Sequence, residues 1–140
     1  MSRTVLAEAE AFTALDVPAT MEAQDRVTRT AGRFFLDHGL LVTPTSAALP
    51  APHGTLAYDA PGQTARSWLR RIFTHGPFTA AFDISGHPAI SLPLGQSRES
   101  PPIGVQFVAA HGQEELPLQV AARLEQAVPW KDRQPPAYVD

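Results

Sequence analysis

The 140-residue sequence contains no cysteine and a single lysine, Lys131. Without cysteine, disulfides, thiol catalysis and zinc–thiolate sites are excluded together. Lys131 follows the last expected helix, which argues against Schiff-base or lysine-base chemistry. No two serines and no two glycines are adjacent, and glycine-rich phosphate-binding patterns are missing.

Long apolar runs are missing as well. No uncharged apolar stretch approaches the roughly 20 residues that a membrane-spanning helix needs. Glu8 and Glu10 interrupt the region where an export signal would need a continuous apolar run. The net charge is −3 and the basic residues are scattered, with the tightest cluster at Arg66, Arg70 and Arg71. We therefore expect a cytoplasmic protein with no membrane or nucleic-acid partner.

The overall composition is that of a folded domain. Hydrophobic residues make up 44% of the chain and charged residues 18%, so we expect one domain over residues 1–140, with a frayed tail at 131–140. The 14 prolines are about twice the usual share of ~5%. They cluster at 44–61, 77–102 and 129–136, where we expect stiff loops.

Helical periodicity predicts four main helices. Pro18 should end the first and Thr20 should cap the second, while Pro117 is tolerable only in the first turn of the last. One further helical turn is predicted at 78–81. The expected ranges are 4–15, 20–38, 63–75 and 112–128.

Three short segments have strand character. The continuous apolar run 40–42 predicts a strand covered on both faces, as in a parallel sheet. Residues 89–94 and 103–109 alternate in side-chain size, which predicts an antiparallel hairpin. Pro93 cannot donate to a strand ladder, so its strand should be irregular or at an edge. Together these elements predict an α/β fold with flanking helices.

The histidines do not predict a metal site. All five lie next to a glycine, at turn positions, and no two have the i, i+4 spacing that places ligands on one helix face. They are His38, His53, His75, His87 and His111.

Asp83, Ser85 and His87 bring three triad residue types within five positions. A nucleophilic triad needs groups that converge from separate segments, and side chains this close along one chain should point apart. We expect instead that Asp83 or Ser85 holds the turn at 86–88 by bonding to its backbone.

Four stretches, taken in order, carry a family resemblance. They read LLVTPT, FTAAFDISGHPAISLPLG, PIGVQFVA and LPLQVAARLEQAVPW, and over about residues 25–133 they resemble the C-terminal region of the amidase signature family, whose members hydrolyse carbon–nitrogen amide bonds. The matching positions are Gly86, Pro88, Ala89, Pro93, Gly95, Pro102, Gly104, Gln106, Leu124, Glu125, Pro129 and Trp130. Asp83 departs from the pattern, since the family usually has Asn there.

The resemblance implies a partial α/β/α mixed sheet that forms one wall of the substrate cleft. It also implies a Ser–cis-Ser–Lys triad that lies N-terminal to the matched region and has no counterpart here. We therefore expect an amidase part that supplies scaffold and cleft, is inactive alone, and needs no cofactor. Its candidate substrate-binding residues come from the loop 44–54 and the turn 85–89, and are Pro44, Thr45, Ser85 and His87.

The implied partners follow from the same resemblance. A small amide would be the substrate of the complete enzyme. An N-terminal amidase half, or a second copy of this chain, would cover the sheet edge and apolar surface that this piece exposes. A different class of function also fits the sequence, namely a non-catalytic α/β module that binds a ligand or partner through its sheet edge.

Overall fold

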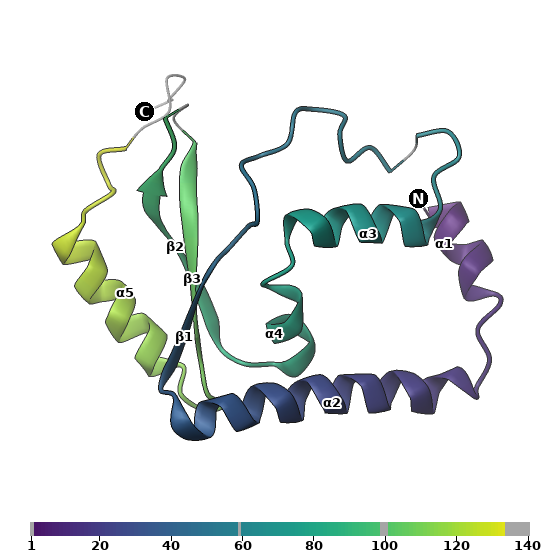
Figure 1. The fold of residues 1–140 in the computed structure, drawn as a ribbon, viewed down its shortest axis with the longest axis horizontal. Helices are drawn as coiled ribbons and strands as arrows, with labels where there is room; N and C mark the ends of the chain where they lie inside the picture. Colours follow the sequence, from purple (N-terminus) through teal and green to yellow (C-terminus); the bar gives the residue numbers. More distant parts are fainter. Residues whose placement is uncertain (1, 59, 99–100, 134–140) are drawn as a thin grey trace.

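The computed structural model describes residues 2–58, 60–98 and 101–133. Five helices and three strands follow one another along this part of the chain (Figure 1). Their bounds are α1 Ser2–Ala9, α2 Asp16–Asp37, β1 Leu40–Pro44, α3 Ala65–His75, α4 Ala80–Ser85, β2 Ala89–Gln96, β3 Pro102–Ala109 and α5 Glu115–Ala127.

The three strands form one sheet in the order β1-β3-β2. Both pairings are antiparallel: Val42 and Ile90 lie on either side of Phe107. β1 and β2 therefore run in the same direction without pairing to each other. The expectation of a parallel strand covered on both faces at 40–42 was wrong, because β1 is an edge strand of these three and Val42 is 54% exposed.

The predicted β2–β3 hairpin is confirmed. Leu92 pairs with Val105, but the next pair is Gly95 with Ile103, so the register shifts around Pro93. A proline has no N–H to give to the ladder, and β2 accommodates it at an irregularity on an edge.

Helices cover both faces of the sheet. α5 packs on β2 and β3, α3 and α4 lie on the opposite side, and α2 runs along the lower end of the sheet (Figure 1). Gln106 of β3 faces the second group, because its side-chain amide donates to the carbonyl of Phe78, before α4, at 3.4 Å. This arrangement confirms the α/β class with flanking helices.

The predicted helices are present with shifted bounds, and Thr20 does not cap the second helix but lies inside α2. Pro18 does not end the first helix: α1 stops at Ala9, and Pro18 lies in the first turn of α2, where its missing N–H costs nothing. The Asp16 carboxylate accepts hydrogen bonds from the N–H and hydroxyl of Thr13 at 2.7 and 2.8 Å, which lowers the pKa of Asp16. Pro117 lies in the first turn of α5, as predicted. Most of the expected frayed tail, from residue 134 onward, lies outside the described residues.

The proline-rich loop between β1 and α3 is tied to α3 along its length. Trp68 Nε1 donates to the carbonyl of Leu56 at 3.1 Å, and Arg71 donates to the carbonyl of Thr55. At the start of α3, Thr64 and Ser67 form a capping box, and the Glu8 carboxylate of α1 accepts from the N–H of Ala65 at 3.0 Å. The described residues of the loop are therefore held in place although they form no helix or strand.

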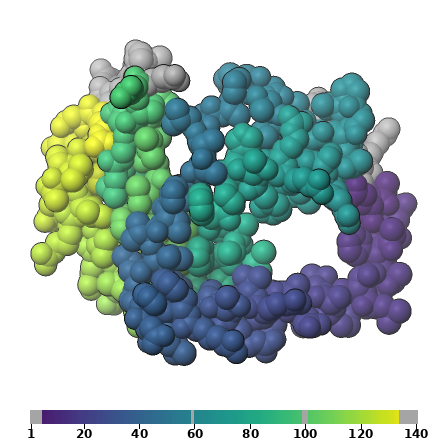
Figure 2. Space-filling model, in the orientation of Figure 1, coloured from purple at the N-terminus to yellow at the C-terminus, as the bar shows by residue number. Residues whose placement is uncertain are grey.

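The chain is more open than a compact monomer. Its accessible surface is 10434 Å², against about 7,100 Å² for a folded monomer of this mass. Sixteen large hydrophobic side chains are exposed among the described residues. Figure 2 shows a gap through the molecule between α2, α3 and α4. The sheet has a core around Val108, whereas α1 and α2 leave much of their apolar surface uncovered.

Candidate functional site

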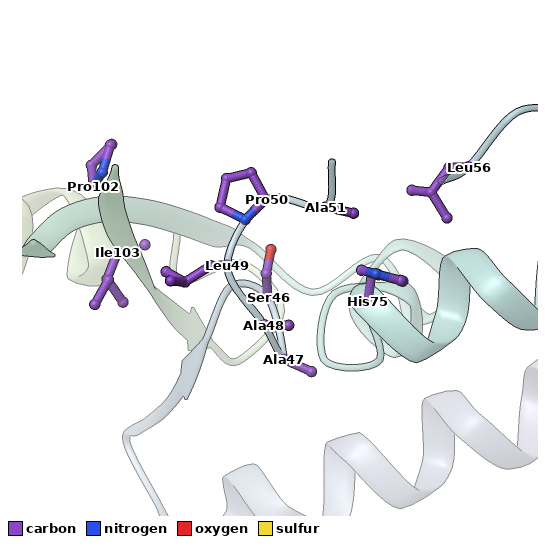
Figure 3. Close-up of a pocket in the computed structure, with 11 residues that line it drawn as sticks. Ser46, Ala47, Ala48, Leu49, Pro50, Ala51, Leu56, His75, Pro102 and Ile103 are labelled. Carbon is purple, nitrogen blue, oxygen red and sulfur yellow. The ribbon is translucent and has the colours of Figure 1, made fainter. Parts of the chain in front are cut away.

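A cavity of about 520 Å³ lies beyond the carboxyl end of β1. Its size falls within the range of about 300–1,000 Å³ that is typical of ligand pockets. The segment 46–51 forms one wall, and Figure 3 shows Pro102 and Ile103 of β3 on one side of it, and His75 and Leu56 on the other. Ligands of α/β folds commonly bind at the carboxyl ends of strands.

Two backbone hydrogen bonds fix the wall of this cavity. The N–H of Thr45 donates to the carbonyl of Gly104 at 2.9 Å, and the N–H of Ala47 donates to the carbonyl of His75 at 2.8 Å. The first bond ties the segment to the central strand and the second ties it to the end of α3. The cavity is therefore held by regular elements on both sides.

A pair of hydroxyl groups lies next to the cavity. Thr45 Oγ1 and Ser91 Oγ are 2.5 Å apart, although their segments flank β3 on opposite sides. Gly104 makes this contact possible, because a Cβ at that position would lie 2.7 Å from Thr45 Oγ1 and 3.0 Å from Ser91 Oγ.

Ser85 and His87 lie at the opposite end of the sheet, before the start of β2. Ser85 Oγ and His87 Nδ1 are 2.8 Å apart, and each residue is 5% exposed. The expectation that these side chains would point apart was therefore wrong, since the left-handed Gly86 between them (φ 71°) folds the chain back. Asp83 is exposed and does not join them.

The Ser85–His87 pair lacks the features of a nucleophile and base. His87 Nε2 is buried and has no hydrogen-bond partner among the described residues, so no carboxylate orients the ring. The ring instead packs against those of Phe35 and His111, at centroid distances of 5.1 and 4.0 Å. Burial, and secondarily the nearby His111, lower the pKa of His87. The pair holds the turn between α4 and β2.

The four sequence-predicted site residues thus form two separate groups. Pro44 and Thr45 directly precede the cavity wall, while Ser85 and His87 are buried at the far end of the strands. Sequence analysis missed His75, which lines the cavity. Its place in the last turn of a helix before Gly76 gave no signal that it would meet a loop almost thirty positions earlier.

Three further observations bear on function. A second cavity of about 440 Å³ lies between α2 and α4, lined mostly by apolar side chains, with Arg26 and Thr30 also in its lining. The described residues contain no group of three or more His, Cys, Asp or Glu side chains placed to hold a metal ion. No helix in the described part of the chain has both the length and the apolar character needed to cross a membrane.

The sequence profile of the Amidase family matches residues 1–118. This match covers most of the chain, and the chain belongs to that family. The resemblance drawn from the sequence motifs is confirmed.

Individual relatives agree with this assignment. A 6-aminohexanoate-cyclic-dimer hydrolase from Paenarthrobacter ureafaciens is 62% identical over 58 residues, which is 41% of this chain and 12% of that protein. An acylamidase from Rhodococcus erythropolis is 31% identical over 131 residues, 94% of this chain and 27% of its own length. The solved structure of 6-aminohexanoate cyclic dimer hydrolase complexed with substrate superimposes with a TM-score of 0.75 at 36% identity, covering 91% of this chain and 27% of that one.

The chain spans about a quarter of the length of the acylamidase and of the solved hydrolase. It therefore corresponds to a part of an amidase, and the Ser–cis-Ser–Lys residues expected of the family have no counterpart in it. The family's serine pair and catalytic lysine are thus missing, because the chain has no adjacent serines and its one lysine, Lys131, lies outside the helices.

Proposed function

We propose that this chain forms the C-terminal wall of the substrate cleft of an amidase. The observation that carries the proposal is the cavity beyond β1, because its wall is fixed by backbone hydrogen bonds and its lining contains neither a lysine nor a pair of serines. Residues 1–140 act as one domain portion, with Pro44 and Thr45 contributing at the edge of the cleft. Ser85 and His87 support it indirectly, through the turn that starts β2.

The catalytic residues belong to a polypeptide segment outside this sequence. The surface of the chain supports the presence of such a segment, since its 10434 Å² exceeds the value for a compact monomer by about 3,300 Å². An excess of this size on one chain is larger than the roughly 1,000–2,500 Å² per partner that obligate interfaces bury. The occupant in our proposal is the N-terminal part of an amidase, which covers α1, α2 and the apolar cavity between α2 and α4.

The substrate in our proposal is a small aliphatic amide, and the complete enzyme acts in the cytoplasm. The names of the relatives support this substrate class, because one is a 6-aminohexanoate-cyclic-dimer hydrolase and another an acylamidase. The largely apolar lining of the cavity agrees with an aliphatic ligand. No cofactor, membrane or nucleic acid takes part in the proposed reaction.

Reconstitution tests the proposal. The chain is co-expressed with the N-terminal part of 6-aminohexanoate-cyclic-dimer hydrolase, ending where the structural match to this chain begins, and hydrolysis of the cyclic dimer is measured. We expect activity from the pair and none from either part. A control pair carries alanine in place of the N-terminal part's catalytic lysine.

Hydrolysis by this chain alone would contradict the proposal that the catalytic residues lie in another polypeptide segment. Stable association without any hydrolysis of aliphatic amides would favour the alternative function, a non-catalytic partner-binding module.

A further inference from the structure

Few polar side chains line the cavity beyond β1. Among the described residues that line it, Ser46 and His75 alone carry polar side-chain atoms. The rest present alkyl groups or backbone, with Leu49, Leu56 and Ile103 as the largest. No carboxylate and no arginine belongs to this lining, so the cavity suits neither a strongly cationic nor a strongly anionic ligand.

The hydrogen bonding of His75 determines what its free nitrogen can do. His75 Nδ1 lies 3.0 Å from the carbonyl oxygen of Arg71. A carbonyl only accepts, so Nδ1 carries the proton, and the neutral ring keeps a lone pair on Nε2. In that form Nε2 can accept a hydrogen bond from the N–H group of a ligand.

Ser46 supplies the complementary group. Its hydroxyl can donate to a carbonyl, and Figure 3 shows its oxygen on the same side of the segment as Pro50. Ser46 and His75 are held in fixed relation, because Ala47, the neighbour of Ser46, is bonded through its N–H to the carbonyl of His75 at 2.8 Å. An acceptor and a donor on two connected segments, in an otherwise apolar lining, match the N–H and C=O of an amide.

We infer that this cavity is a subsite for alkyl amides, in which His75 Nε2 accepts the amide N–H and the Ser46 hydroxyl donates to the amide carbonyl. The alkyl chain of the ligand packs between Leu49 and Ile103. The inference rests on the proposed function and assigns to it a specificity-determining residue, His75. No bond is made or broken at this subsite.

The test compares two probes that differ in the N–H group. Hexanamide has both amide groups, while methyl hexanoate keeps a carbonyl on the same acyl chain and lacks the N–H. Dissociation constants for the full chain are measured by titration in ¹H–¹⁵N correlation spectra. We expect hexanamide to bind about three- to tenfold more tightly, as one neutral hydrogen bond provides.

Four variants assign the preference to individual groups. His75→Phe should bind both probes equally, and His75→Gln should keep a preference for the amide because its side-chain oxygen accepts. Ser46→Ala should weaken the binding of both probes, since both have a carbonyl, and should weaken hexanamide at least as much because an amide oxygen is the stronger acceptor. The control is His53→Phe, which changes an exposed histidine of the same loop and should leave both constants unchanged.

The inference is overturned by equal binding of the two probes to the unmodified chain, by absence of binding, or by an amide preference that survives in both His75→Phe and a His75→Leu variant. The experiment measures binding and needs no hydrolysis. If the chain shows no preference for hexanamide but the reconstituted enzyme hydrolyses amides, only the subsite is refuted. If the chain prefers hexanamide but the reconstituted pair does not hydrolyse amides, only the proposed amidase function is refuted.

Discussion

The hydroxyl oxygens of Thr45 and Ser91 lie 2.5 Å apart across the strand that separates their segments. Side chains on β1 and β2 are normally kept apart by the residue between them on β3. Here Gly104, whose carbonyl accepts from the N–H of Thr45, has no side chain, and the two hydroxyls meet where its Cβ would lie. One glycine thus brings together two strands that do not pair, next to the wall of the cavity.

Gly104→Ala should destabilise the chain by about 1–3 kcal/mol, the usual cost of overpacking. The added Cβ would lie 2.7 Å from Thr45 Oγ1, so the hydroxyl pair must separate. Urea unfolding measures the loss. The matched control is Gly39→Ala, because a Cβ there meets nothing within 4 Å. Equal stability of the two variants would contradict the tight contact.

Stability should fall as the pH drops below about 6.5, the ordinary pKa of histidine. Burial lowers the pKa of His87 in the folded chain, so the unfolded chain takes up a proton first and is favoured by acid. The contribution is fully present above that pH and is lost as the pH falls towards the folded pKa. Urea midpoints measured between pH 8 and pH 5 test the direction.

The His111→Phe variant separates the two causes of this shift. A phenyl ring keeps the packing against His87, at a ring distance of 4.0 Å in the native chain, and removes the positive charge. Because burial is the larger cause and His111 the smaller, we expect a weaker pH dependence that does not disappear. Complete loss of the pH dependence would assign it to His111 instead.

Ser85→Ala should cost about 1–3 kcal/mol, since it leaves the buried Nδ1 of His87 without a partner. His87 Nε2 already lacks one among the described residues, so the ring would lose its last hydrogen bond. Ser46→Ala is the control, and its exposed position should keep the change within about 0.5 kcal/mol. A neutral effect of Ser85→Ala would mean that water or a shifted ring replaces the bond.

Two further glycines should respond to alanine with opposite signs. A Cβ meets nothing within 4 Å at either Gly32 or Gly112. Gly32 lies within α2, where alanine should stabilise the chain by about 0.5–1 kcal/mol. Gly112 has φ 75°, where alanine should cost about 1–2 kcal/mol. Thermal unfolding of the two variants decides; a shift of the same sign in both would refute the conformational argument.

Local chemistry was enough to predict most elements. Alternation at 89–94 and 103–109 predicted the β2–β3 hairpin, and Pro93 predicted its irregularity, because strand periodicity and a missing N–H act within a few residues. The start of α2 was harder, since Pro18 reads equally as a helix end or as a first-turn residue. The apolar run 40–42 suggested a buried parallel strand. The sequence alone does not show whether such a run lies in the middle of a sheet or, as β1 does, at an edge of the described strands.

The sequence by itself determined the family, the helices and hairpin, and the absence of a Ser–Ser–Lys triad. These follow from residue types and spacings along the chain. Only the tertiary structure decided that Thr45 meets Ser91 over Gly104, that Ser85 bonds to His87, and that His75 lines the cavity beside Ser46. These contacts depend on the strand order, on the left-handed Gly86 and on the position of the end of α3 next to the loop. All three are set by packing between segments that are far apart in the chain.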